Sequence, residues 1–312
     1  MRNRWSSRSV GSPWQHRFFY HLIRLGGLRP AYAFLAFVVT WYTLRPSTRK
    51  RGKAYLEHRF PEAGFFAMLA HTWKLQWNLG LCLIDRAAAG ILGGYAFSAG
   101  AGESLPATIS ALARAGNGII MLAAHTGVWQ MSPYFLAEHA GVPVSALVHR
   151  DAGDIDKQAH EHAGQAPPYR VLDAEDGLGA SIALIQLLRH GELVCMMGDR
   201  TDGTRGEPPD DARSGPAVPA VRVSFLGSTI ALPYTAYRLA SVSGAPVLFA
   251  FALRTGPRKG ALAVTEAFHV PPGLGKAAGA YRPYAQRFAN ALEDFSRAHP
   301  YQFFNFFNLW ER

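Results

Sequence analysis

Cysteine is almost absent from this sequence of 312 residues, which contains only Cys82 and Cys195. The two lie far apart in apolar surroundings and form no CxxC pair, so they provide neither a disulfide framework nor a cysteine metal site. We therefore expect two buried free thiols in a protein of a reducing compartment.

Several catalytic signatures are missing as well. The chain has no P-loop and no GxGxxG after a strand, and the lack of a GxSxG elbow weakens the case for a serine hydrolase. The 12 histidines include His160 and His162 beside Glu161, but this group lies on a polar stretch that predicts solvated surface. We expect no metal site.

Acidic residues are nearly absent from the first sixty positions. Residues 1–60 hold 12 Lys+Arg and one acid, Glu57, which gives 12 − 1 = +11. The rest of the chain holds 32 − 12 = 20 basic and 22 − 1 = 21 acidic residues, which gives −1. Such an arm is typical of proteins that bind nucleic acid or an anionic membrane surface.

The uncharged run inside this arm favours the membrane. Residues 30–44 would form about 22 Å of helix, short of the roughly 30 Å hydrocarbon core. Basic residues flank the run on both sides, which favours shallow insertion on the cytoplasmic face over a span or an ordinary core helix. Its aromatic residues are not interleaved with charges, which argues against nucleic acid. No small-residue cleavage site follows, so a signal peptide is not expected.

The periodicity of the chain predicts an α/β fold. An all-helical opening gives way to alternating strands and helices, which indicates a mixed, mostly parallel sheet flanked by helices. We divide the chain into a basic, membrane-associating helical segment, 1–60, and a second domain, 61–312, that contains the sheet. Helices are expected at 14–28, 30–44, 47–59, 64–84, 104–115, 128–140, 154–165, 178–190, 233–243 and 280–298. Strands are expected at 119–124, 143–148, 169–172, 193–197, 220–226, 228–231, 246–253 and 261–266.

A histidine stands where the first buried strand ends. Residues 119–124 are apolar, His125 follows, and Gly127 lets the backbone turn into a helix. Open α/β sheets bind ligands at the carboxyl ends of their strands, so His125 is a candidate general base, although a structural role is also open. Gln130, one turn further on, could fix the tautomer of His125 but could not stabilise its charged form.

Two further strands end in charged residues. Strand 143–148 leads to Arg150, which could bind a phosphate or carboxylate or could cap the sheet edge. Strand 193–197 leads to Asp199 and Arg200, so three strands deliver polar groups to one edge. The loop 201–218 is either a passive surface loop or a lid. The aromatic C-terminal segment either packs in the core or lines an acyl groove.

These pieces together resemble a known family. They are AAHTGVWQ around His125, VHR ending at Arg150, MGDR ending at Arg200, VSFLG at 223–227 with Leu232-Pro233, GAPV at 244–247, and the closing LEDFSRAHPYQFFNFFNLW. The chain resembles the lipid A biosynthesis lauroyl/myristoyl acyltransferases of the lysophospholipid acyltransferase superfamily. More narrowly, it is similar to the acyltransferases of bacterial aryl polyene and xanthomonadin-type pigment clusters.

The resemblance implies acyl transfer at the cytoplasmic face of a bacterial inner membrane. The donor would be a thioester of an acyl carrier protein or of coenzyme A, with no cofactor, and the acceptor a hydroxyl or amine of a lipid or glycolipid. In the family, the histidine of an H-x4-D/E motif is the general base, and His125 occupies that position. Gln130 occupies the position of the acidic residue, which is a departure from the family pattern. Asp199 would be catalytic, and substrate would be bound by Arg150, Arg200, Thr126 and Trp129. Two alternatives stay open: a non-catalytic acyl- or lipid-binding scaffold, and a lysophospholipid or amine acyltransferase.

Overall fold

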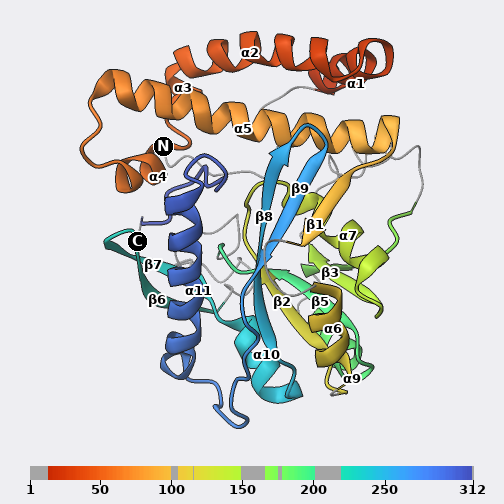
Figure 1. Cartoon of the computed structure of the whole chain (residues 1–312). Helices are drawn as coiled ribbons and strands as arrows, with labels where there is room; N and C mark the ends of the chain where they lie inside the picture. The colour runs from red at the N-terminus through yellow and green to blue at the C-terminus, as the bar shows by residue number, and fades with distance from the viewer. Residues whose placement is uncertain are drawn as a thin grey trace.

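A seven-stranded sheet with helices around it is the centre of the computed structural model, which describes residues 13–99, 105–114, 116–148, 166–174, 178–200 and 219–310. The strand order is β1-β9-β8-β2-β5-β3-β4 (Figure 1). The strands are β1 (Ala96–Ala99), β2 (Ile119–Ala123), β3 (Val144–Val148), β4 (Arg170–Asp173), β5 (Leu193–Met197), β8 (Val247–Gly256) and β9 (Lys259–Val264).

The sheet is mixed but mostly parallel, as the sequence predicts. Strands β8, β2, β5, β3 and β4 run in one direction, while β9 pairs antiparallel with β8 and parallel with β1. Strands β2 and β5, in the middle of the sheet, are apolar along their whole length because other elements cover both faces of a parallel sheet. In β2, the four residues from Ile119 to Leu122 are all buried. Ala123 of β2 lies level with Met197 of β5, so the residues that follow these two strands leave the sheet side by side.

Four of the helices that flank the sheet are short. They are α6 (Leu105–Ala113), α7 (Ser132–His139), α9 (Leu178–Arg189) and α10 (Thr235–Ser243). A 3₁₀ turn at Trp129–Met131 precedes α7, so the helix expected at 128–140 begins in this tighter form. Strand β1 was not predicted, and the expected helices at 154–165 and 104–115 fall wholly or partly outside the described residues.

The N-terminal helices form a layer across one end of the sheet. The layer contains α1 (Pro13–Gly26), α2 (Leu28–Leu44) and α5 (Phe65–Leu92), while α3 (Pro46–Arg49) and α4 (Lys53–Arg59) replace the single basic helix expected at 47–59 (Figure 1). Leu35 and Val39 of α2 pack with Ile23 of α1 against Leu81 and Ile84 of α5, in a small core of their own. Among the described helices, none is long and apolar enough to cross a membrane. Membrane association of residues 1–60 and the division at residue 60 stay predictions.

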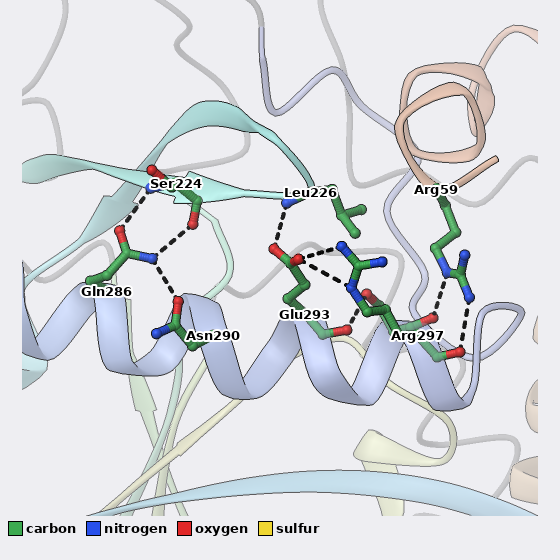
Figure 2. Close-up of polar contacts among 8 residues, drawn as sticks. Arg59, Ser224, Leu226, Gln286, Asn290, Glu293 and Arg297 are labelled. Carbon is green, nitrogen blue, oxygen red and sulfur yellow. Dashed lines mark hydrogen bonds and ion pairs between the residues drawn. The ribbon is translucent and has the colours of Figure 1, made fainter. Parts of the chain in front are cut away.

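Helix α11 (Ala278–Ala298) holds the hairpin of β6 (Ala220–Phe225) and β7 (Ser228–Pro233) through side chains (Figure 2). The side-chain amide of Gln286 accepts the Ser224 N–H at 2.8 Å and donates to the Ser224 carbonyl at 2.9 Å, as a neighbouring strand would. Glu293 accepts the N–H of Leu226, at the hairpin turn, at 2.6 Å. Arg59 of α4 donates to the carbonyls of Ser296 and Arg297 near the end of the same helix. These contacts tie the hairpin and α4 to one helix.

Candidate active site

The turn after β2 is clamped between β8 and the C-terminal segment. Gly127 has φ +44°, and a Cβ there would lie 2.4 Å from the carbonyl oxygen of Ala252, so a side chain cannot be accommodated. On the other side, the Gly127 N–H donates to the Gln302 carbonyl at 2.8 Å, and the Phe304 N–H donates to the His125 carbonyl at 2.8 Å. The backbone of His125 is therefore fixed from two directions.

His125 faces a buried carboxylate. Its Nδ1 lies 2.9 and 3.0 Å from the two carboxylate oxygens of Asp199, and its backbone N–H donates to the same group at 3.3 Å. An ionised carboxylate only accepts hydrogen bonds, so Nδ1 carries the hydrogen and Nε2 keeps its lone pair. The imidazole side chain is 18% exposed and that of Asp199 is fully buried. This geometry presents a basic nitrogen next to a charge that would stabilise its protonated form.

The environment keeps His125 neutral near neutral pH. Burial lowers the pKa of His125 below its ordinary value, the Arg200 cation lowers it further, and the carboxylate of Asp199 opposes both. For Asp199, burial tends to raise the pKa, but the charge and hydrogen bonds of His125, together with Arg200, hold it below the usual range. An ionised carboxylate beside a neutral imidazole is the arrangement that a general base requires.

Gln130 does not bond to His125 as the sequence predicted. Its side-chain oxygen accepts a hydrogen bond from Arg86 of α5 at 2.6 Å, and the Nδ1 of His125 is occupied by Asp199. The prediction that Gln130 holds the tautomer of His125 is therefore corrected: the acid comes from β5 and not from the H-x4 position. The spacing of residues in the sequence could not show this contact. His125 and Asp199 are 74 positions apart and meet only through the pairing of β2 with β5.

The other predicted site residues differ in what surrounds them. Trp129 is half-buried, with its ring 5.4 Å from that of His125, and forms an aromatic wall beside the base. Thr126 has no exposed surface and bonds to the Ala124 carbonyl, so its burial does not support the substrate contact that we predicted for it. Arg150 lies outside the described residues, as does the loop 201–218.

Arg200 links the site to the C-terminal segment. Its guanidinium donates to the Phe304 carbonyl at 3.0 Å and lies 5.2 Å from the ring centroid of Phe307. Its Nε is 3.9 Å from the nearer oxygen of Asp199. Phe303 and Phe304 are fully buried, so this part of the aromatic C-terminus packs in the core. The binding of substrate by Arg200 stays a prediction.

Two residues of this region were not identified from the sequence. Arg86 lies within the apolar helix α5, and Gln302 lies within an aromatic run, so neither follows a strand. Gln302 also joins its side-chain amide to the backbone of Arg254, accepting at 2.8 Å and donating at 3.1 Å. Within the part of the chain that the structure describes, no three His, Cys, Asp or Glu side chains gather as a metal site would require.

Comparison with known families decides the wider relationship. Residues 107–312 match the family model described as "Bacterial lipid A biosynthesis acyltransferase". The chain belongs to this family. No curated protein gives a match.

The range that matches the lipid A acyltransferase family contains the site and most of the sheet. The matched range includes His125, Asp199 and Arg200, together with the C-terminal segment that clamps the turn. The family acts on lipid by acyl transfer, so the chain is an acyltransferase of that broad class. The matched range begins within α6, so the N-terminal helical layer lies outside it.

Proposed function

We propose that this protein transfers an acyl chain from a thioester to a hydroxyl or amine of a lipid or glycolipid acceptor, with His125 as the general base. The observation that carries this proposal is the His125–Asp199 pair at the carboxyl edge of the sheet, with Nδ1 on the carboxylate and Nε2 available. The family supplies the reaction class, and the pair supplies a chemistry that fits it.

The reaction would proceed by direct attack on the thioester. Nε2 of His125 removes the proton of the acceptor hydroxyl, and the acceptor oxygen forms a bond to the thioester carbonyl carbon. The carbon–sulfur bond then breaks and the thiolate leaves, taking a proton from the imidazolium or from water. Asp199 stabilises the imidazolium while it exists. Trp129 would confine the approach of the acyl chain on one side.

The donor would be an acyl carrier protein in preference to free coenzyme A. The support is the family likeness and the cationic residues that the sequence places near the site, among them Arg200. We expect no further cofactor, since the thioester already activates the acyl group. Competition between the two thioesters in one assay would distinguish the donors.

The protein would work at the cytoplasmic face of the bacterial inner membrane. In support, α1, α2 and the start of α5 expose large apolar side chains. Residues 1–60 also carry the excess of positive charge. The most exposed of these side chains are Trp14, Leu25, Phe37, Trp41, Leu44, Phe65 and Phe66. Exposed apolar side chains on a strongly basic segment are typical of proteins that lie on an anionic bilayer.

The narrower likeness to aryl polyene and xanthomonadin-type acyltransferases remains a proposal about the acceptor. A lysophospholipid or amine acceptor is the alternative within the same chemistry. The non-catalytic scaffold was motivated by the missing acid at Gln130. The position of Asp199 removes that motive, because a carboxylate does face His125.

The test of the proposal is the loss of acyl transfer on replacing His125. We expect His125→Ala to lower the rate by about 10²-fold or more, because a positioned base contributes 10²–10⁴-fold. His190→Ala is the matched control, since His190 is exposed at the end of α9 and should retain wild-type turnover. A folded His125→Ala protein with near-normal turnover would refute the assignment, and circular dichroism would confirm folding.

A further inference from the structure

We infer that a hollow between α1, the end of α2 and α3 binds the phosphate headgroup of an anionic glycerophospholipid. The hollow has a volume of about 470 Å³ and is lined by Gln15, Trp41, Tyr42, Arg45, Ser47, Thr48 and Arg51. The inference deepens the proposed function, because it rests on the membrane-bound reaction and names a lipid site apart from the catalytic pair.

The hollow contains two guanidinium groups, which have no acidic partner among the described residues. The described part of the chain places no carboxylate within ion-pairing distance of Arg45 or Arg51, and the nearest acid in the sequence, Glu57, pairs with Lys53 at 3.2 Å. Arginine binds phosphate through two parallel N–H···O bonds, which makes such a pair well suited to a phosphodiester. The charge of the hollow is therefore complementary to an anionic headgroup.

The walls of the hollow are fixed by their own contacts. The Arg45 guanidinium lies 4.8 Å from the ring centroid of Trp41, which leaves the edges of the guanidinium available to a ligand. Tyr42 donates to the side-chain oxygen of Gln15 at 3.2 Å, which joins α2 to α1. Thr48 donates to the Tyr42 carbonyl at 2.5 Å and thereby holds the turn between α2 and α3. These contacts hold α1, the end of α2 and the turn into α3 together around the hollow.

The place of the hollow favours a lipid over a soluble phosphate. Trp41 lines the hollow and is itself one of the exposed large apolar side chains, and Leu44 is exposed just before Arg45. Nearby, the Arg49 guanidinium lies 5.7 Å from the ring of Phe65, which is also exposed. Cations over exposed aromatic rings match the headgroup level of a bilayer, where acyl chains would contact the apolar side chains and a phosphate would reach the arginines.

The test uses charge-conserving variants of the full chain. The double variant Arg45→Lys/Arg51→Lys keeps the net charge and removes the planar guanidinium groups that can bind a phosphate through two N–H groups. The matched control is Arg24→Lys/Arg29→Lys, at exposed positions outside the hollow. Binding is measured by cosedimentation with phosphatidylcholine vesicles, with and without phosphatidylglycerol. On the anionic vesicles we expect the first variant to bind at least about fivefold more weakly than wild type, and the control to bind as wild type does, since lysine cannot form the bidentate contact.

Each other outcome overturns a stated part of the inference. If the two variants bind equally, only general charge attraction operates and there is no headgroup site. If inorganic phosphate at matched ionic strength displaces wild type as well as short-chain soluble phosphatidylglycerol does, the hollow is a general phosphate site. If the wild-type protein binds neither kind of vesicle, both the membrane docking and the headgroup site are refuted. Acyl transfer to a soluble acceptor is measured in parallel, so failure of the reaction is distinguishable from failure of the site.

Discussion

At the scale of single residues, the site depends on a carboxylate that lies far from its base in sequence. His125 follows β2 and Asp199 follows β5, and the parallel pairing of these strands brings the two side chains together. Since burial and Arg200 lower the pKa of His125 below its ordinary value of 6.5, turnover should rise with pH through that lowered pKa and be maximal at neutral pH.

The first residue-scale prediction concerns the carboxylate. Asp199→Asn should reduce turnover by roughly 10²–10⁴-fold, because an amide can donate to Nδ1 and favour the wrong tautomer; in serine proteases the same replacement costs about 10⁴-fold. The acidic limb of the pH–rate profile should also move to lower pH, since Asp199 raises the pKa of His125. An unchanged pH profile together with normal turnover would show that Asp199 does not act on the base.

The second residue-scale prediction separates Gln130 from the base. Gln130→Ala and Gln130→Glu should both keep turnover within roughly threefold of wild type. The Gln130 side chain bonds to Arg86, and Asp199 is the residue that holds His125. The glutamate would pair with Arg86, so the pH–rate profile should move less than for Asp199→Asn. The measurement is the pH–rate profile of the three variants side by side. A loss in Gln130→Ala as large as that in Asp199→Asn would show that Gln130 does act on His125.

At the scale of elements, α11 holds the β6–β7 hairpin through polar side chains. The pattern of the sequence predicted both strands and the helix to within a few residues. It did not predict that Gln286 pairs with the backbone of Ser224 as a strand would, or that Glu293 accepts from Leu226. These contacts depend on how the helix crosses the hairpin, which periodicity does not encode.

The element-scale prediction concerns Glu293. Burial tends to raise its pKa, but hydrogen bonds from Arg297 and from the Leu226 N–H hold that pKa below the ordinary 4.5. A lowered folded-state pKa adds stability above the unfolded pKa, and this stability is lost as pH falls through the folded value. Glu293→Gln should therefore lower the free energy of unfolding by about 0.5–1.5 kcal/mol at pH 7 and by much less in acid.

The matched control for this variant is Glu266→Gln, at an exposed position. Urea unfolding at several pH values measures the difference between the two variants. A difference from wild type that stays constant into acid would mean that the charge of Glu293 contributes nothing to stability.

At the scale of the whole molecule, one buried ion pair joins the N-terminal layer to the sheet. Asp85 of α5 accepts from Arg254 at the end of β8 at 2.8 Å and from the backbone N–H of Arg258 at 3.0 Å. Tyr32 of α2 also donates to Asp85, and Arg254 donates to the Tyr32 hydroxyl at 3.2 Å. Three segments distant in sequence therefore meet on one carboxylate.

The prediction at this scale concerns the removal of that carboxylate. Asp85 is fully buried and the Arg254 side chain is 12% exposed, so Asp85→Ala leaves a largely buried cation unpaired. We expect a loss of about 3–5 kcal/mol in the free energy of unfolding. Asp85→Ala/Arg254→Met should recover part of that loss, because the uncompensated charge is gone. Urea unfolding measures both variants, and a cost below about 1 kcal/mol for the single variant would contradict the coupling.

The sequence by itself determined the alternation of strands and helices, the placement of His125 at a strand end and the uneven distribution of charge. These features are local, because apolar periodicity and glycine positions act within one element. Only the tertiary structure decided that Asp199 and not Gln130 faces His125, that β1 joins the sheet beside β9, and that Asp85 meets Arg254. Such pairings depend on strand order and on the crossing of layers, and the packing of the whole chain fixes both.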